Sequence, residues 1–202
     1  MSAQIQLITS VQEAEQLSAF LNSVWSDGAE VAPFDLIIAA IHVGAYAVVA
    51  KQGEKVVGGS FAFIGKFNGA TILHSHVTAA TVPGVGFLIK QHQKLWAADR
   101  GLSAITWTFD PLVRRNCVFN FEKLGATAVE FLPNFYGAMT DSINAGDVSD
   151  RLFAYWPTDS ANKVIQPIGK TLEIALPEDI ESLRKSDLEG ALEWRRQIRE
   201  IL

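Results

Sequence analysis

The stretch TILHSHVTAATVPGVGFLIKQHQKLWAADRGLSAITWTF, residues 71–109, contains the strongest indication of how the chain folds. Residues 71–80 are typical of a strand, residues 86–100 of a helix, and residues 102–109 alternate apolar and polar side chains as a strand does. Two glycines and a proline lie in the loop between the first strand and the helix. Because a strand–helix–strand unit joins parallel strands, we predict that 71–78 and 102–109 pair in parallel.

The residues before this stretch predict two helices. Ser10 and Glu13 match a capping box, which opens an amphipathic helix through about residue 24 with Val11 among its inward-facing side chains. Pro33 starts a second helix, because proline suits the first helical position.

An antiparallel meander is expected next. Strands are predicted at 45–50 and 56–65, and the pair Asn68-Gly69 is the strongest hairpin signal in the chain. This pair should join the second of these strands to the one at 71–78.

The residues after 109 predict a further helix and more strands. Asp110-Pro111 is typical of a helix start and Gly125 of a helix end, so we predict one helix between them. Later strands are predicted at 126–132, 151–156 and 171–176, and a last helix from Pro177. We expect a main domain at 1–156 and a C-terminal extension, a strand plus a helix, at 157–202.

Composition narrows the function classes. A hydrophobic fraction of 49% with 19% charged residues indicates a globular protein. The net charge of −5 gives no reason to expect nucleic acid or an anionic membrane as a partner. With Cys117 as the single cysteine, a disulfide framework and a cysteine-based zinc site are not expected. The first residues lack a signal peptide pattern and the apolar stretches are too short for a membrane helix, so we expect a cytoplasmic protein.

The order of elements resembles the GNAT superfamily of N-acyltransferases. The segments HSHVT, ITWTFDPL, RRN, FEKLGA, LPNFYG and SDRL resemble a subgroup of predicted acetyltransferases within it. The resemblance implies an α/β (α+β) fold with a mixed, mostly antiparallel sheet, helices on both faces and a parallel fourth and fifth strand. It also implies acetyl-CoA or another short acyl-CoA as co-substrate without a metal, a small amine as acceptor, and a homodimer. Relatives run longer, so we expect the chain to be truncated after its last helix.

The glycine loop falls where this superfamily binds the pyrophosphate of CoA. The superfamily pattern ends in a glycine, one further residue and then a glycine or alanine. Gly84 and Gly86 match these two positions, but the leading arginine or glutamine of the pattern falls on Thr81. From the sequence alone the loop is either a tight turn or an anion cradle. The resemblance assigns CoA binding to Val77, Thr78, Gly84, Val85, Gly86, Phe87 and Asn116, with Phe87 also expected in the core.

Acyl transfer to an amine needs a base, donors for the oxyanion and an acid for the thiolate. His74 and His76 should share one face of their strand because side chains alternate with period two, so either could be the base. Equally, both could be structural histidines, and a metal site is a third, weaker interpretation.

Tyr136 is the sequence-based candidate for the acid. The superfamily often places a tyrosine on the helix after the fifth strand, where this chain has Phe121, which cannot donate a proton. Tyr136 would then act from its loop, or simply pack beneath it. Asp150 and Arg151 could bind an acidic acceptor or acyl group, or could pin the loop through a local ion pair.

Two functions therefore remain from the sequence. The first is direct N-acyl transfer from acetyl-CoA or a related short acyl-CoA to a small amine such as an amino acid. The second is a degenerate, non-catalytic member of the fold that binds a ligand or serves a structural role, which Thr81 and Phe121 favour.

Overall fold

The computed structural model describes residues 2–25, 30–137, 147–159 and 173–202. The chain divides into two compact units. Unit 1 comprises Met1–Trp107 with Pro157–Asn162, and unit 2 comprises Thr108–Trp156 with Lys163–Leu202. Within the described ranges, no helix is both long enough and apolar enough to cross a bilayer.

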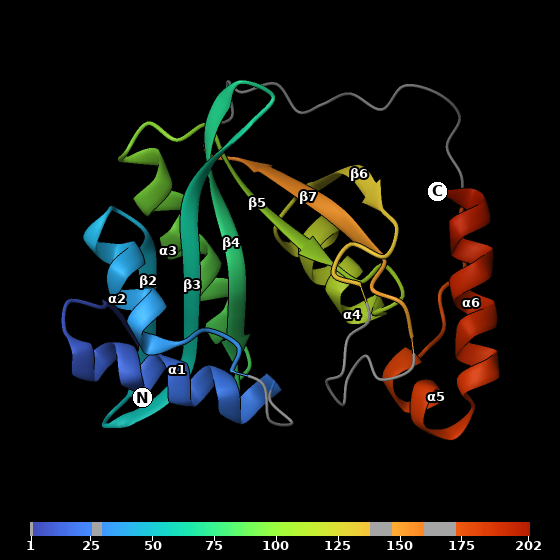
Figure 1. Ribbon diagram of the computed structural model, residues 1–202, viewed down its shortest axis with the longest axis horizontal. Helices are drawn as coiled ribbons and strands as arrows, with labels where there is room; N and C mark the ends of the chain where they lie inside the picture. Colours follow the sequence, from blue (N-terminus) through green and yellow to red (C-terminus); the bar gives the residue numbers. More distant parts are fainter. Residues whose placement is uncertain (1, 26–29, 138–146, 160–172) are drawn as a thin grey trace. The chain divides into compact units, whose positions relative to one another are not determined.

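Unit 1 is built on a mixed sheet (Figure 1). Its strands are β1 (Gln4–Leu7), β2 (Tyr46–Gln52), β3 (Lys55–Phe67), β4 (Ala70–Ala80) and the first part of β5 (Ala104–Phe109). From β1 to β4 neighbouring strands are antiparallel, whereas β4 and β5 are parallel, with Leu73 opposite Ile105 and His74 opposite Thr106. The predicted parallel pair is therefore confirmed. Strand β1 was not predicted, because four residues are too few to establish a period.

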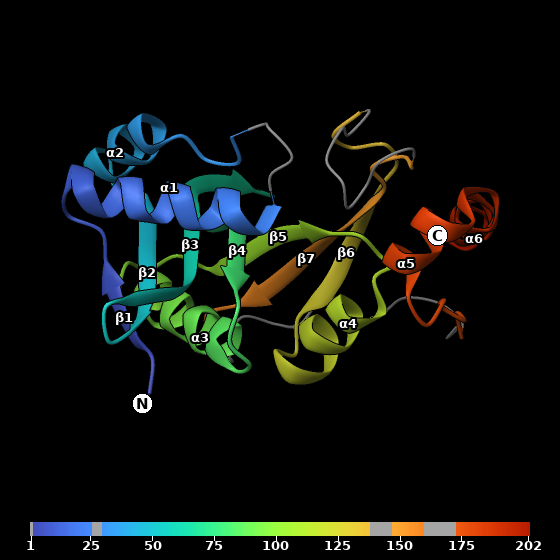
Figure 2. The same cartoon turned by 90° about the horizontal axis from the view of Figure 1, so that it is seen from below.

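Helices cover both faces of this sheet, as predicted. Figure 2 shows α1 (Val11–Trp25) and α2 (Phe34–His42) on one face and α3 (Val85–Ala98) on the other. Two consecutive glycines of β3 permit the close approach. A Cβ on Gly58 would lie 2.7 Å from the Val85 side chain of α3, and one on Gly59 would collide with Leu17 of α1.

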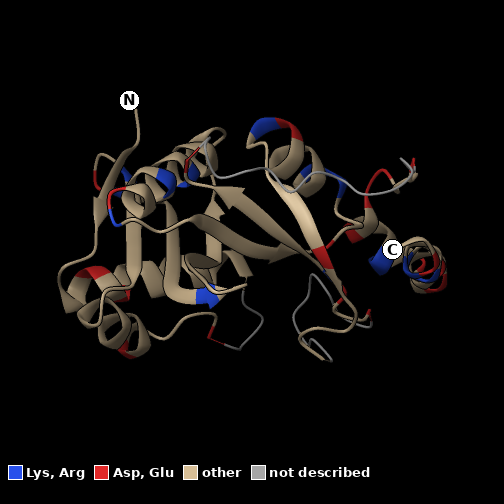
Figure 3. Cartoon of the chain, turned by 90° about the horizontal axis from the view of Figure 1, so that it is seen from above, with Lys and Arg blue, Asp and Glu red and all other residues tan. Residues whose placement is uncertain are grey.

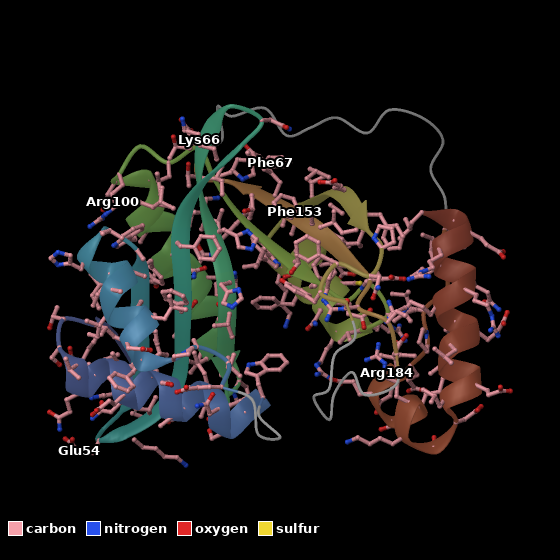
Figure 4. The ribbon with its side chains drawn as sticks, in the orientation of Figure 1. Glu54, Lys66, Phe67, Arg100, Phe153 and Arg184 are labelled. Atoms are coloured by element: carbon pink, nitrogen blue, oxygen red, sulfur yellow. The ribbon has the colours of Figure 1, made fainter. Side chains whose placement is uncertain are left out.

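Two local signals in unit 1 act as the sequence predicts. At the β3–β4 turn, Asn68 and Gly69 have φ of 49° and 80°, the positive values that a tight hairpin turn requires. Figure 4 labels Lys66 and Phe67 at the end of β3, just before this turn. At the start of α1, Ser10 N donates to a Glu13 carboxylate oxygen over 3.1 Å, and Glu13 N donates to Ser10 Oγ over 3.3 Å.

Unit 2 contains the antiparallel pair β6 (Thr127–Leu132) and β7 (Arg151–Pro157), which confirms both predicted strands. Its helices are α4 (Arg114–Cys117), the π-helix η1 (Val118–Lys123), α5 (Ile180–Ser186) and α6 (Leu188–Ile201). An apolar core joins the segment after β5 to the last two helices; its buried members are Leu112, Val113, Ile180, Ala191 and Ile198.

Several predictions of local structure are wrong. The helix expected from Asp110 begins only at Arg114, because the Asp110 carboxylate is buried against two arginines and accepts a hydrogen bond from Leu112 N. Residues 173–176 form no strand, although 171–176 was predicted as one. The single last helix is two helices, because Asp187 ends α5 and caps α6. Val11, predicted to face inward, is exposed at the first position of α1, ahead of the turns that pack on the sheet.

Candidate functional site

Strands β4 and β5 pair over a short distance only. The pairing includes Leu73 with Ile105 and His74 with Thr106, while β4 continues to Ala80. A β-bulge interrupts β4 just beyond, since Ala62 of β3 is opposite Ser75 and Phe61 is opposite Val77. His76 is therefore the extra residue of the bulge. Bulges re-aim side chains and end pairing, and they are common beside active sites.

The glycine turn leads from β4 into α3. Gly84 has φ of 84° and ψ of −22°, a left-handed conformation that favours glycine, and stands at the N-cap of α3. No side chain caps this helix and its first turn holds no acidic residue. The amides at its start can therefore donate hydrogen bonds to an anion, which the positive end of the helix dipole would also stabilise.

Two residues beside the glycine turn, Thr81 and Phe87, differ from what was expected of a pyrophosphate-binding loop. Thr81, at the position of the superfamily's leading residue, is tied to β3, because its amide nitrogen and its hydroxyl both donate to Val57 O, over 2.9 and 3.3 Å. Phe87 is 37% exposed, so the expectation that it packs in the core is wrong; it lies on the solvent side of the first turn of α3.

His74 and His76 lie on one face of β4, as the two-residue period predicts. Their ring centroids are 5.2 and 6.1 Å from that of Phe63. His74 Nδ1 is 3.0 Å from Thr106 Oγ1. Burial lowers the pKa of His74 to about 4, with further lowering by the charges of His76 and Lys90, and burial also lowers the pKa of His76. Both imidazoles are neutral at pH 7 and able to accept a proton. His76, which is exposed, is the more accessible base.

A buried polar cluster occupies the other face of β4. The Lys90 Nζ of α3 donates to Ser75 Oγ over 2.8 Å and stands 4.1 Å from the centroid of the Trp107 ring. Gln93 Nε2 donates to Ser60 Oγ and Ser75 Oγ over 2.9 and 3.1 Å. Burial lowers the pKa of Lys90 to about 7. Sequence reasoning missed this cluster, because a lysine in a helical stretch is usually on the solvent side and only the packing of α3 on β4 reveals otherwise.

In unit 2 the structure brings Tyr136 and Arg151 together. The Tyr136 hydroxyl lies 2.7 Å from Thr108 Oγ1, its side chain is 43% exposed, and the Arg151 guanidinium stands 5.4 Å from its ring centroid. The NFYG turn is anchored from the strand β7 side: Asn134 N donates to the Asp150 carboxylate over 2.8 Å, and Tyr136 N donates to Ser149 Oγ over 2.9 Å.

Asp150 and Arg151 do not pair with each other through their side chains. The Asp150 carboxylate accepts two hydrogen bonds of 2.6 Å from Arg199 of α6, and Arg151 donates to the backbone oxygen of Asp150 over 2.9 Å. Burial would raise the pKa of Asp150, yet the hydrogen bond from Arg199 and that from Asn134 N hold it below its ordinary value. Both residues therefore brace the turn that carries Tyr136, which leaves less of either for a ligand.

A larger set of charged side chains, all buried except that of Arg199, includes Asp150. Arg195 donates to Asp110 over 2.9 Å and to Asp147 over 2.7 Å, and Arg184, labelled in Figure 4, binds the same two carboxylates. We call Asp110, Asp147, Asp150, Arg184, Arg195 and Arg199 the Asp–Arg cluster. Figure 3 shows that α6 carries acidic and basic residues together.

The described residues of α4 and η1 make structural contacts. Asn116 is half-buried and its amide nitrogen donates to Val113 O. Arg115 forms an exposed ion pair with Glu181. The Cys117 thiol donates to Pro111 O over 3.3 Å, and burial raises its pKa to about 11, so it is no thiolate nucleophile at neutral pH. Phe121 packs edge-on against Phe109.

Solved structures of GNAT-family acetyltransferases share this fold. Arabidopsis thaliana Naa50 in complex with the bisubstrate analogue CoA-Ac-MVNAL is 19% identical and superposes with a TM-score of 0.59 over 77% of this chain and 98% of its own. Aminoglycoside 6'-acetyltransferase type Ii is 18% identical, with a TM-score of 0.60 over 81% and 99% of the two chains. A GNAT family acetyltransferase from Elizabethkingia anophelis with acetyl-CoA bound is 13% identical, with a TM-score of 0.57 over 77% and 98%. No protein-family model and no curated protein matches the sequence. The chain therefore has the GNAT fold.

Proposed function

We propose that the protein transfers an acetyl or related short acyl group from CoA to a small amine such as an amino acid. One observation carries the proposal: β4 and β5 stop pairing after His74 and Thr106, and the bulged end of β4 runs into a helix whose first amides no side chain caps. A gap between parallel strands beside a helix N-terminus suits an extended thioester with a pyrophosphate at one end.

The roles assigned to unit 1 follow from this geometry. Gly84, Val85, Gly86 and Phe87 would form the pyrophosphate site, chiefly through the amides of Gly86 and Phe87, because the Val85 amide donates to Val82 O over 3.2 Å. Val77 and Thr78, directly after the bulge, would donate backbone hydrogen bonds to the pantetheine arm and the developing oxyanion. His76 would take the proton of the attacking amine, directly or through a water, with His74 beside it. No metal and no covalent intermediate are needed for this direct transfer.

In unit 2, Asn116 would contact CoA and Asp150 with Arg151 would contact the acceptor, while Tyr136 is one of two candidates for the acid. Two of these residues also have a structural role. The Tyr136 hydroxyl contacts Thr108, and the Asp150 carboxylate binds Arg199. The acceptor class is supported by the similar structures, whose names include an aminoglycoside acetyltransferase and a peptide-like bisubstrate analogue. We also propose a cytoplasmic location, which suits a chain with Cys117 as its sole cysteine.

A non-catalytic protein of the same fold is the second candidate. Thr81 takes the position of the usual basic or amide residue and is hydrogen bonded to β3, and Phe121 takes the position of the usual tyrosine. A protein of this kind would bind CoA without releasing it from acetyl-CoA in the presence of amines.

A pair of substitutions at Gly84 tests the anion site. Gly84→Asp and Gly84→Asn impose the same left-handed strain, at a cost of about 1 kcal/mol each, but only the aspartate adds a negative charge. If the pyrophosphate binds there, calorimetry with acetyl-CoA should show at least about tenfold weaker binding for Asp than for Asn, with matching thermal stability. Equal affinity of the two variants would mean that the loop is only a turn.

A further inference from the structure

Lys90 stands at the closed end of the gap between β4 and β5. Its Nζ contacts Ser75 Oγ at 2.8 Å and the Trp107 ring at 4.1 Å. Ser75 directly follows His74 in β4, and Trp107 directly follows Thr106 in β5; these are the residues where the pairing of the two strands stops. The nitrogen therefore bridges the two strands at the point where they begin to separate.

The charged and polar groups around Lys90 include no carboxylate. From β4, His74 and His76 face the opposite side of the strand and are neutral at pH 7, while Ser75 accepts the hydrogen bond. The same Ser75 oxygen also accepts a hydrogen bond from Gln93 Nε2 of α3 over 3.1 Å. Among the described residues, no Asp or Glu forms an ion pair with Lys90. Burying a cation without a counter-charge costs free energy of folding, so we expect a chemical role for Lys90.

The proton affinity of this nitrogen suits an acid. Because burial lowers the pKa of Lys90 to about 7, the side chain is a far stronger acid than an ordinary lysine and still partly protonated at neutral pH. General acids act best when their pKa lies near the working pH. A departing CoA thiolate is more basic than such a group and would take its proton readily.

We propose, resting on the proposed function, that the Lys90 ammonium protonates the sulfur of CoA as the thioester bond breaks. The amine nitrogen of the acceptor attacks the acyl carbon and forms the C–N bond, and its proton passes to His76 or water. The tetrahedral intermediate then collapses, the C–S bond breaks with its electron pair on sulfur, and one proton moves from Lys90 Nζ to that sulfur. Solvent returns the proton taken by the base to Lys90, so each turnover balances.

This assignment supplies the acid that the sequence lacks at Phe121. Lys90 belongs to unit 1, on the helix α3 that follows the glycine turn and packs against the bulged strand β4. Tyr136 differs because its hydroxyl is partnered by Thr108 on the exposed side of its own turn. Among the residues that the structure describes, the Lys90 amine contacts the Ser75 hydroxyl and the face of the Trp107 ring, so it has further N–H groups that could donate to a ligand.

The test compares Lys90→Met with Lys55→Met, which removes an exposed lysine of β3. Acetyl-CoA turnover with an amine panel is measured between pH 6 and 9, together with acetyl-CoA binding and thermal stability. Lys90→Met should bind acetyl-CoA within about threefold of wild type and melt no lower, because methionine fills the site without a buried charge. Its kcat should fall by roughly 10²-fold or more, and the decline of wild-type kcat above a pH of about 7 should disappear. Lys55→Met should behave as wild type.

A second acyl donor distinguishes a role of Lys90 in protonating the leaving group from a role in packing alone. An acetyl thioester of an aromatic thiol releases a thiolate that is stable at neutral pH and needs no proton. With this donor the deficit of Lys90→Met should shrink to less than about threefold, whereas a structural defect would persist in full. An undiminished deficit, an alkaline decline that survives in Lys90→Met, or unchanged turnover by that variant would each overturn the role of Lys90 alone. If the wild-type protein releases neither CoA from acetyl-CoA nor the aromatic thiol from the second donor, the proposed function and this inference fail together.

Discussion

The two units treat buried charge in opposite ways. In unit 2, the Asp–Arg cluster pairs its own buried guanidinium groups with carboxylates, as when Arg195 binds Asp110 and Asp147. In unit 1, the Lys90 ammonium is as deeply buried, at 5% exposure, but has a serine hydroxyl and an indole ring in place of a carboxylate.

The difference shows in the proton affinities. Burial would raise the pKa of Asp110, but hydrogen bonds and charge from Arg195 and Arg184 hold it below its ordinary value. For Lys90 burial acts without such compensation and lowers the pKa to about 7. Paired charges thus remain ionised and hold elements together, while an unpaired one becomes easy to titrate, which is a property of reactive groups.

The largest expected effect follows from breaking the paired cluster. Arg195→Met leaves Asp110 and Asp147 buried with one arginine fewer, so the free energy of unfolding should fall by about 3–5 kcal/mol in urea titrations. Arg196→Met, one residue along α6, removes an exposed pair with Glu193 and should cost less than about 1 kcal/mol. Similar losses for the two variants would contradict the claim that the cluster stabilises unit 2.

An intermediate effect is expected in the pH dependence of stability. The pKa of Lys90 is about 7 in the folded protein and about 10.4 in an unfolded chain. Between these values the unfolded chain binds a proton that the folded protein does not. The free energy of unfolding should therefore rise with pH in this window, by at most about 1.4 kcal/mol per pH unit.

The Lys90→Met variant isolates that slope. Cys117 has the opposite effect on the pH dependence of stability. Its thiol pKa is about 11 in the folded protein and lower in the unfolded chain, so the free energy of unfolding falls as the pH rises between these two values. Since Cys117 is present in both proteins, the wild-type curve minus the variant curve from pH 7 to 9.5 reports Lys90. A flat difference would mean that the folded protein keeps Lys90 protonated and that the contrast between the units is absent.

The smallest effect is expected at Tyr136. Tyr136→Phe removes the hydrogen bond to Thr108 and keeps the ring contacts with Phe135 and Arg151, so stability should drop by about 1 kcal/mol. With Lys90 as acid, turnover should remain within about threefold of wild type. A loss of roughly 10²-fold at unchanged KM for acyl-CoA would instead give the acid role to Tyr136.

Local signals in the sequence were sufficient for much of unit 1. The capping box at Ser10 and the turn at Asn68-Gly69 are decided by residues that adjoin one another, and period-two strands with a helix between them predict the parallel pair of β4 and β5. These features depend on interactions between residues close in sequence, so they can be predicted without knowledge of the fold.

Long-range contacts explain what the sequence could not predict. Asp110 resembles a helix cap in the sequence, but its carboxylate binds Arg184 and Arg195, which lie 74 and 85 positions away, and the helix starts later. Lys90 looks like a surface lysine until α3 is packed on β4. The bulge at His76 depends on the register of β3, which the pattern of β4 does not contain.

The most direct test of the account is release of free CoA from acetyl-CoA by the wild-type protein, followed with a thiol reagent across a panel of small amines. We expect amine-dependent release that saturates with acetyl-CoA, together with binding of acetyl-CoA in calorimetry. Absence of binding at millimolar acetyl-CoA would contradict the assignment of an acyl-CoA site. Binding without amine-dependent release would contradict catalysis and identify a non-catalytic protein with the same fold.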